Sequence, residues 1–143
     1  MDWMQILVWL AFFSSLYIII FWLLTLFEKG LLTETKKIRR FPFVSIAIPA
    51  FNEEKNIIET LDSVINLDYP KNKYEIIVVD DGSKDNTFNI VKNYISKNKL
   101  SNVHLIHQNN SGKGAALNNA LYSSKGIFFV CLDADSTVAP GSL

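Results

Sequence analysis

An uninterrupted apolar stretch near the N-terminus constrains the fold of this chain more than any other feature of its sequence. From Trp3 to Phe27 no residue carries a charge. As a helix, at about 1.5 Å per residue, the stretch is longer than the roughly 30 Å hydrocarbon core of a bilayer. It is also too long for a typical buried helix, and it lacks the basic start and the small-residue cleavage site of a secretory signal peptide. The sequence therefore predicts a retained transmembrane helix at residues 1–28.

The charges on either side of this stretch predict how it is oriented. No basic residue precedes it, whereas five follow it closely, namely Lys29, Lys36, Lys37, Arg39 and Arg40. Because Lys and Arg are retained on the cytoplasmic side of membrane proteins, we expect the N-terminus outside the cell and the rest of the chain in the cytosol. We therefore expect a single pass through the plasma membrane, followed by a basic juxtamembrane linker at residues 29–43 that meets anionic lipid headgroups.

Composition narrows the partners and the compartment. The 14 Lys and Arg residues balance 14 Asp and Glu residues, so the formal net charge is zero and no nucleic-acid partner is indicated. The one cysteine, Cys131, stands in an apolar run and has no partner for an internal disulfide, which agrees with a reducing compartment.

From Val44 onward, short apolar runs alternate with segments of helical periodicity. The runs predicted as strands are VSIAIP (44–49), YEIIVVDDGS (74–83), VHLIH (103–107) and GIFFVCLDAD (126–135). The predicted helices are 52–67, with Asn52 as its N-cap, 85–98 and 112–124. This alternation is typical of an α/β fold, with a mostly parallel sheet, right-handed crossovers and helices on both faces. We expect the apolar runs IIVV and IFFVCL to be covered on both faces.

Four polar clusters follow the predicted strands: PAFNE, DDGS, NNSGKG and DAD. In an open parallel sheet, ligands bind outside the carboxyl ends of the strands. Unrelated polar residues would be distributed over both edges of the sheet. We therefore expect the four clusters to form a single cleft.

The last cluster has the residue types of a divalent-metal site. Asp133 and Asp135, separated by one residue at the end of a strand, can project to the same side and offer hard oxygen ligands to Mg²⁺ or Mn²⁺. Such an ion can bridge a diphosphate and stabilise its charge as it leaves. The alternative is an Asp that caps or turns the chain before a further helix. His104 and His107 lie three apart in a predicted strand, so we expect them on opposite faces, in structural or exposed positions.

The clusters DDGS and NNSGKG suggest contacts to a nucleotide. Asp80 and Asp81 end a predicted strand, where a carboxylate can accept a hydrogen bond from a base N–H or a ribose hydroxyl; an Asx turn is the alternative. Lys113, between Gly112 and Gly114 at the start of a predicted helix, offers a point charge to a phosphate; the alternative is a solvated loop lysine. The cluster is not a Walker A motif, because the required spacing from glycine to the Gly-Lys pair is absent.

The segments VSIAIPAFNE, EIIVVDDGSKDNT, NNSGKGAALNNAL and FVCLDADS, in this order and at these intervals, resemble family 2 glycosyltransferases. The resemblance covers Val44 to the end of the chain. With an apolar span before the domain, the closest resemblance is to membrane-bound synthases of poly-β-N-acetylglucosamine, with chitin, hyaluronan and cellulose synthases as relatives. The resemblance implies a GT-A fold, a Rossmann-like α/β domain that binds a nucleotide sugar.

The resemblance also implies roles for individual residues. The implied ligands of a nucleotide-sugar donor such as a UDP-sugar are Pro49, Ala50, Phe51, Glu53, Asp81, Lys113 and Asp133, and the implied ligands of the divalent ion are Asp133 and Asp135. Phe51 stands where many relatives have Tyr, so a hydroxyl contact at that position is lost.

The implied reaction is an inverting, metal-dependent transfer from a UDP-N-acetylglucosamine-like donor to a growing polysaccharide. In the family the general base lies well downstream of the DxD strand, so we expect residues 44–143 to be a donor-binding domain truncated after that motif, without a catalytic base. A complementing C-terminal polypeptide is then a candidate partner. The alternatives are a polyprenyl- or dolichyl-phosphate sugar transferase with a lipid-linked acceptor, an inactive nucleotide-binding module, and a membrane-anchored domain without a ligand.

Overall fold

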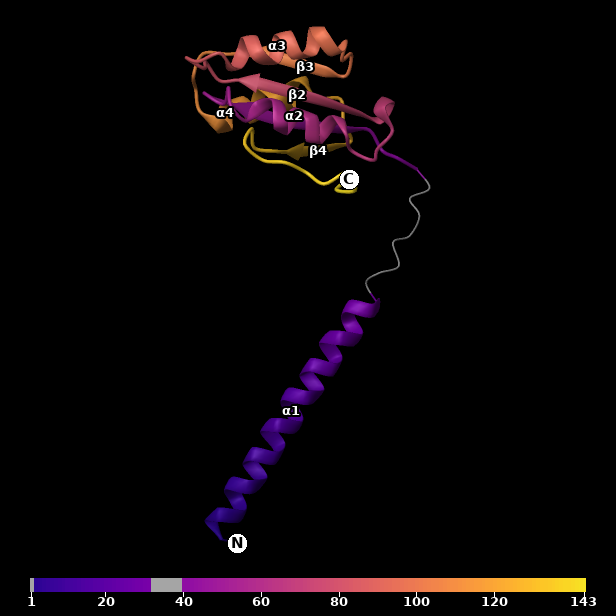
Figure 1. Ribbon diagram of the computed structural model, residues 1–143, viewed down its shortest axis with the longest axis vertical. Helices are drawn as coiled ribbons and strands as arrows, with labels where there is room; N and C mark the ends of the chain where they lie inside the picture. Colours follow the sequence, from indigo (N-terminus) through magenta and orange to yellow (C-terminus); the bar gives the residue numbers. More distant parts are fainter. Residues whose placement is uncertain (1, 32–39) are drawn as a thin grey trace. The chain divides into compact units, whose positions relative to one another are not determined.

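The structure, a computed structural model, describes residues 2–31 and 40–143. The chain divides into two units, an N-terminal unit that ends at Arg39 and a second unit from Arg40 to Leu143 (Figure 1). Residues 32–39 of the predicted basic linker lie outside the described residues, so its contact with lipid headgroups stays a prediction.

The N-terminal unit contains one long helix, α1 (Trp3–Leu31). Its window from Trp3 to Leu26 has a mean hydropathy of 2.4. Ser14, Ser15 and Thr25 donate their hydroxyls to backbone carbonyls three or four residues earlier, at 2.8–2.9 Å. These bonds satisfy polar groups that lipid could not satisfy. By length and composition, α1 suits a membrane span.

The second unit is a four-stranded, wholly parallel sheet with the strand order β3-β2-β1-β4. Its strands are β1 (Val44–Ala50), β2 (Tyr74–Asp80), β3 (Val103–His107) and β4 (Phe128–Cys131). Its helices are α2 (Ile57–Ile65), α3 (Thr87–Asn98) and α4 (Lys113–Ser123), and a 3₁₀ turn, η1 (Lys71–Lys73), precedes β2. The predicted α/β class and parallel sheet are confirmed.

Helices cover both faces of this sheet, as the sequence predicts. On one face, alternate residues of β1 and β2 pack with the apolar sides of α2 and α3 in the larger core, which includes Ile46, Ile48, Leu61, Ile76, Val78 and Val91. On the other face, α4 places Ala116 and Ala120 against Ala47, Ile77 and Val79. The small side chains let α4 lie close to the strands. The two central strands are therefore buried on both faces, which fixes their register.

The predicted N-cap of α2 is wrong. The helix begins at Ile57 rather than after Asn52, and Asn52 has a left-handed backbone with φ of 56°. The cause is a contact with a distant loop, because the Asn52 side-chain oxygen accepts a hydrogen bond from the Lys84 backbone N–H at 2.8 Å. Asparagine adopts the left-handed region more readily than most residues. The residues between Asn52 and Ile57 form a separate turn beside the sheet edge.

The prediction that the last apolar run is covered on both faces is also wrong. In β4, Phe128 is 57% exposed and Cys131 is exposed. The reason is topological, since in the described part of the chain β4 pairs with β1 on one side and forms an edge of the sheet. β4 ends at Cys131, before the carboxylates; Leu132 N–H still donates to the Ala47 carbonyl at 2.9 Å.

Candidate functional site

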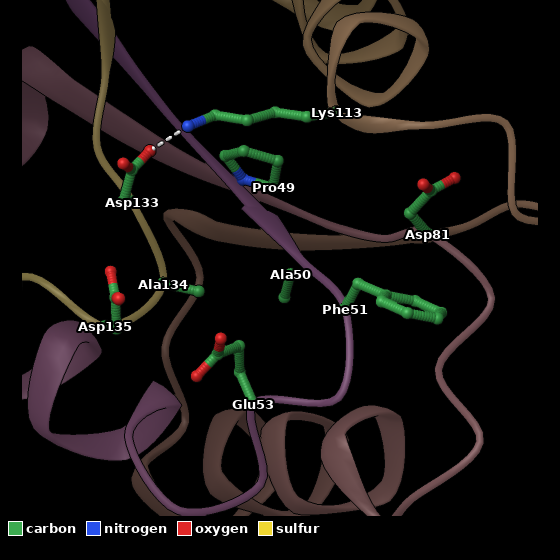
Figure 2. Close-up of a pocket in the computed structure, with 9 residues that line it drawn as sticks. All are labelled: Pro49, Ala50, Phe51, Glu53, Asp81, Lys113, Asp133, Ala134 and Asp135. Carbon is green, nitrogen blue, oxygen red and sulfur yellow. Dashed lines mark hydrogen bonds and ion pairs between the residues drawn. The ribbon is translucent and has the colours of Figure 1, made fainter.

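The carboxyl ends of the strands and the start of α4 surround one cleft, with a cavity volume of about 230 Å³ (Figure 2). The cleft is lined by Pro49, Ala50, Phe51, Glu53, Asp81, Lys113, Asp133, Ala134 and Asp135. Every residue to which the resemblance assigns a role in binding the donor or the metal ion lines this cleft. The spatial convergence of the four clusters follows from the parallel sheet, whose strands all end at this edge.

The loops after β1 and β2 are hydrogen-bonded to each other. Asn52 N–H donates to the Ser83 hydroxyl oxygen at 3.0 Å, and Glu53 N–H donates to the Thr87 hydroxyl oxygen at 2.9 Å. Thr87 is fully buried at the start of α3. Side-chain oxygens of one loop therefore satisfy the backbone N–H groups of the other, which holds the two loops together without a shared strand.

Asp85 fixes the same pair of loops and was missed by the reasoning from sequence. Its carboxylate accepts hydrogen bonds from Thr87 N–H at 3.0 Å and from Glu54 N–H at 3.1 Å. Burial raises the pKa of the Asp85 carboxyl, but the hydrogen bonds from Thr87 and Glu54 outweigh it and hold the pKa below its usual value. An Asp side chain commonly accepts a hydrogen bond from the backbone N–H two residues on, in an Asx turn, and this tendency could have identified Asp85 before the predicted helix.

Asp81 holds the loop that leads into α4. Only 4% of Asp81 is exposed, and its carboxylate accepts hydrogen bonds from Gln108 Nε2 at 2.8 Å, Ser111 N–H at 2.9 Å and Gly112 N–H at 2.8 Å. Burial raises the pKa of this carboxyl, but the three hydrogen bonds together lower it by more. The pKa of Asp81 is therefore below the usual value of an aspartate. Asp81 is therefore ionised at neutral pH and positions the start of α4.

Two glycines with positive φ shape these loops. Gly82, directly after Asp81, has φ of 70°, and a Cβ on it would lie 2.7 Å from the backbone nitrogen of Asn110. Gly112 has φ of 88° at the start of α4. Both are left-handed conformations that glycine adopts without steric cost. Gly82 thus serves the close packing of one loop on the other, whereas Gly112, whose Cβ position is open, serves the backbone turn into α4.

Lys113 and Asp133 form an ion pair across the cleft. Lys113 Nζ lies 2.6 Å from Asp133 Oδ1, and the side chains are 61% and 54% exposed (Figure 2). The hydrogen bond that Lys113 donates to the Asp133 carboxylate, with the added charges of Asp133 and Asp135, raises the pKa of the Lys113 ammonium group. Because both groups face water, the pair adds little to stability. It does set the position of a positive charge at the cleft.

The backbone between the two aspartates is held by a hydrogen bond from α2. Ala134 is 5% exposed, and its carbonyl accepts a hydrogen bond from the buried Thr60 hydroxyl of α2 at 2.7 Å. With Ala134 turned inward, Asp133 and Asp135 both line the cleft. Ser136 N–H donates to the Asp133 carbonyl at 3.1 Å, which forms a turn, and no helix follows within residues 136–143. The alternative from sequence was that an Asp here turns the chain or caps a further helix. The turn is present, whereas no helix follows for an Asp to cap within residues 136–143.

The cleft has ligands that suit Mg²⁺ or Mn²⁺. Asp133, Asp135 and Glu53 contribute carboxylates to its lining, and such hard oxygen ligands are the ones these ions prefer. Within residues 2–31 and 40–143, no set of three His, Cys, Asp or Glu side chains is close enough to hold a metal ion by itself. Mg²⁺ in proteins is commonly held by one or two carboxylates together with water and substrate phosphates, so two aspartates fit this mode.

The histidines and Asp80 lie outside the cleft. His104 pairs in register with Ile77 and His107 with Asp80, so the two rings lie on opposite faces of the sheet, as expected. Asp80 is 1% exposed, and one of its oxygens lies 2.7 Å from His107 Nδ1. Of the two neighbouring acids in DDGS, Asp81 alone lines the cleft.

Comparison with known proteins identifies relatives of the second unit. Residues 45–143 match the family described as Glycosyl transferase family 2. The probable glycosyltransferase YdaM of Bacillus subtilis is 39% identical over 113 residues, which cover 78% of this chain and 27% of YdaM. The poly-beta-1,6-N-acetyl-D-glucosamine synthase of Staphylococcus epidermidis is 32% identical over 112 residues, 78% of this chain and 26% of the synthase. The chain thus spans about a quarter of the length of these relatives.

Solved structures agree with the fold. Staphylococcus aureus TarS 1-349 in complex with UDP-GlcNAc superposes with a TM-score of 0.62 and 37% identity, over 68% of this chain and 28% of that one. The mannosyltransferase PcManGT of Pyrobaculum calidifontis, in complex with GDP-Man and Mn²⁺, gives 0.67 and 32% identity, over 76% of this chain and 33% of that one. Both are structures with a bound nucleotide sugar.

Proposed function

Because the chain belongs to glycosyl transferase family 2, we propose that its second unit binds the nucleotide-sugar donor of a sugar-transfer reaction, with UDP-N-acetylglucosamine as the donor. One observation carries the proposal: Asp81, Lys113, Asp133 and Asp135, which come from three separate segments, line the same cleft. The complex of TarS with UDP-GlcNAc, at 37% identity, supports the choice of donor.

The diphosphate would lie between Lys113 and the two aspartates. The Lys113 ammonium supplies one positive charge at the start of α4, where backbone N–H groups also favour anions. Asp133 and Asp135 would hold Mg²⁺ or Mn²⁺, an ion that supplies positive charge to a departing nucleotide diphosphate. The complex of PcManGT with GDP-Man and Mn²⁺ supports a metal ion in this role.

The base and ribose would lie on the other side of the cleft, against the end of β1. Phe51 is 41% exposed there, and its ring offers an apolar surface to a base, beside Pro49 and Ala50. Asp81 is fixed by three hydrogen bonds, so any contact that it makes with the base edge is positioned before the nucleotide arrives. Glu53 completes this side as a candidate acceptor for ribose hydroxyls.

For the whole protein we propose a membrane-anchored polysaccharide synthase that acts with inversion. In this proposal α1 crosses the plasma membrane with the N-terminus outside, and residues 44–143 form the donor-binding domain in the cytosol. The similarity to the poly-beta-1,6-N-acetyl-D-glucosamine synthase supports a glycan as acceptor. The competing acceptor is a polyprenyl or dolichyl phosphate, and both use the same donor cleft.

Calorimetric titration of the full chain in detergent with UDP-GlcNAc tests the proposal. We expect binding that requires Mn²⁺, and we expect the substitution Asp135→Ala to weaken it by about tenfold or more, because a metal ligand is lost. Asp68→Asn is the matched control, since Asp68 is an exposed acid outside the cleft. Absence of Mn²⁺-dependent binding, or equal affinity in Asp135→Ala, would refute the site.

A further inference from the structure

The pair of Lys113 and Asp133 places a lysine ammonium where the proposed function places a metal ion. Lys113 Nζ is 2.6 Å from Asp133 Oδ1, and within the described part of the chain this is the one ion pair of a lysine or arginine with a carboxylate. Asp135 has no such partner there; it accepts one long hydrogen bond from the Ser136 hydroxyl, at 3.5 Å. The two aspartates are therefore unequal before any ligand binds.

The lysine can leave this position without disturbing the fold. Both side chains of the pair are more than half exposed, and exposed pairs of this kind contribute little to stability. The backbone of Lys113 is nevertheless fixed, because Asp81 accepts hydrogen bonds from Ser111 and Gly112 just before it. The long side chain can therefore swing about a fixed start of α4 while the rest of the cleft stays in place.

We propose that Lys113 is a resident counter-ion of Asp133, which a divalent cation displaces when it binds together with a nucleoside diphosphate. The proposal rests on the proposed function and adds an exchange to it. The cation takes over Asp133 and joins Asp135, and the released ammonium pairs with the diphosphate. No bond is made or broken other than ionic contacts.

This exchange couples the two ligands thermodynamically. A divalent cation that binds alone must separate Lys113 from Asp133 and leave the ammonium without an anion. A nucleoside diphosphate that arrives with the cation supplies that anion, so each ligand raises the affinity for the other by the same factor. The cleft should thus bind Mn²⁺ alone weakly, UDP alone weakly, and both together tightly.

The substitution Lys113→Met separates this proposal from a simple phosphate-binding role. In the full chain in detergent, binding of Mn²⁺ alone is measured from the electron paramagnetic resonance signal of free Mn²⁺, and UDP binding at saturating Mn²⁺ is measured by calorimetry. We expect Lys113→Met to bind Mn²⁺ alone at least about threefold more tightly, since the competing ammonium is gone, and to bind UDP about tenfold more weakly. A single substitution that strengthens Mn²⁺ binding and weakens UDP binding is the result that the exchange predicts.

Controls separate failure of the exchange from failure of the proposed function. Lys97→Met removes an exposed lysine of α3 outside the cleft, so it should change neither affinity. Wild-type protein that binds no UDP with Mn²⁺ would refute the proposed function itself. The exchange alone would be refuted by a different result. In that case the wild type binds UDP with Mn²⁺, but the affinity for Mn²⁺ alone is unchanged or weaker in both Lys113→Met and Lys113→Gln.

Discussion

The two sides of the cleft are built differently. One side, which we call the locked wall, consists of the loops at 50–54, 81–87 and 108–112, held by the carboxylates of the buried Asp81 and the half-buried Asp85. The other, the open wall, consists of Lys113 and the segment 133–135, whose charged groups face water. The carboxylates of Asp81 and Asp85 thus hold backbone N–H groups on one wall, whereas those of Asp133 and Asp135 are exposed on the other.

This difference shows how one edge of a small sheet can combine fixed loops with charged groups that are available to a ligand. A carboxylate that accepts two or three hydrogen bonds in a buried place is committed to the fold. A carboxylate whose one partner is an exposed lysine can exchange that partner for a ligand. The side chains of the locked wall are therefore in place before a base binds, whereas the open wall would exchange its ionic contacts when the ligands bind.

Removal of the Asp81 carboxylate should break the locked wall and have the largest effect. In Asp81→Ala, the donors of Gln108, Ser111 and Gly112 lose their acceptor, which should lower the free energy of unfolding by about 2–4 kcal/mol. Urea unfolding of the full chain, followed by circular dichroism, measures this loss. Asp133→Asn on the open wall is the matched variant, and it should leave the unfolding midpoint unchanged. Equal losses in both variants would abolish the distinction between the walls.

Glycine substitutions should sharpen the same distinction with a smaller effect. In Gly82→Ala, a Cβ at 2.7 Å from the Asn110 backbone and a φ of 70° should together cost about 1–3 kcal/mol in the free energy of unfolding. Gly114→Ala is the control, because Gly114 lies within α4 with no atom near its Cβ position, and alanine there should stabilise by about 0.5 kcal/mol. A neutral Gly82→Ala would show that the two loops do not pack as described.

Acid should weaken the locked wall selectively, with the smallest effect of the three. The pKa values of Asp81 and Asp85 are lower in the fold than the value of about 3.9 expected for an unfolded chain. Their contribution to stability is therefore complete above about pH 5 and is lost as the pH falls through the folded values. We expect the urea midpoint to fall between pH 5 and pH 3, and less steeply in Asp81→Ala. Parallel pH profiles would contradict the assignment.

The order of elements and the convergence of the polar clusters were predictable from sequence. Alternating strands and helices with short connections leave few topologies, and parallel strands bring the segments after Ala50, Asp80 and Cys131 to the same edge. Spacing along the chain therefore carried the information that placed Asp81, Lys113 and Asp135 around one cleft.

The hydrogen bonds between the loops were not predictable, because they join residues that are distant in sequence. Nothing in the local pattern around Asn52 indicates that its side chain binds the Lys84 backbone, so the sequence favoured a helix cap there. Likewise, Gln108 is an ordinary polar residue until Asp81 and Asn119 come within hydrogen-bonding distance, at 2.8 and 3.0 Å. Tertiary contacts, not local propensity, decide these positions.

In the proposed site, the open wall would hold a metal ion in direct contact with the diphosphate of the nucleotide. The most direct test is ³¹P electron–nuclear double resonance of Mn²⁺ bound to the full chain with UDP present, because strong ³¹P coupling requires phosphate oxygen on the ion. We predict strong coupling from protein-bound Mn²⁺ in the wild type and loss of that protein-bound signal in Asp135→Ala. Protein-bound Mn²⁺ without ³¹P coupling at saturating UDP would contradict the claim.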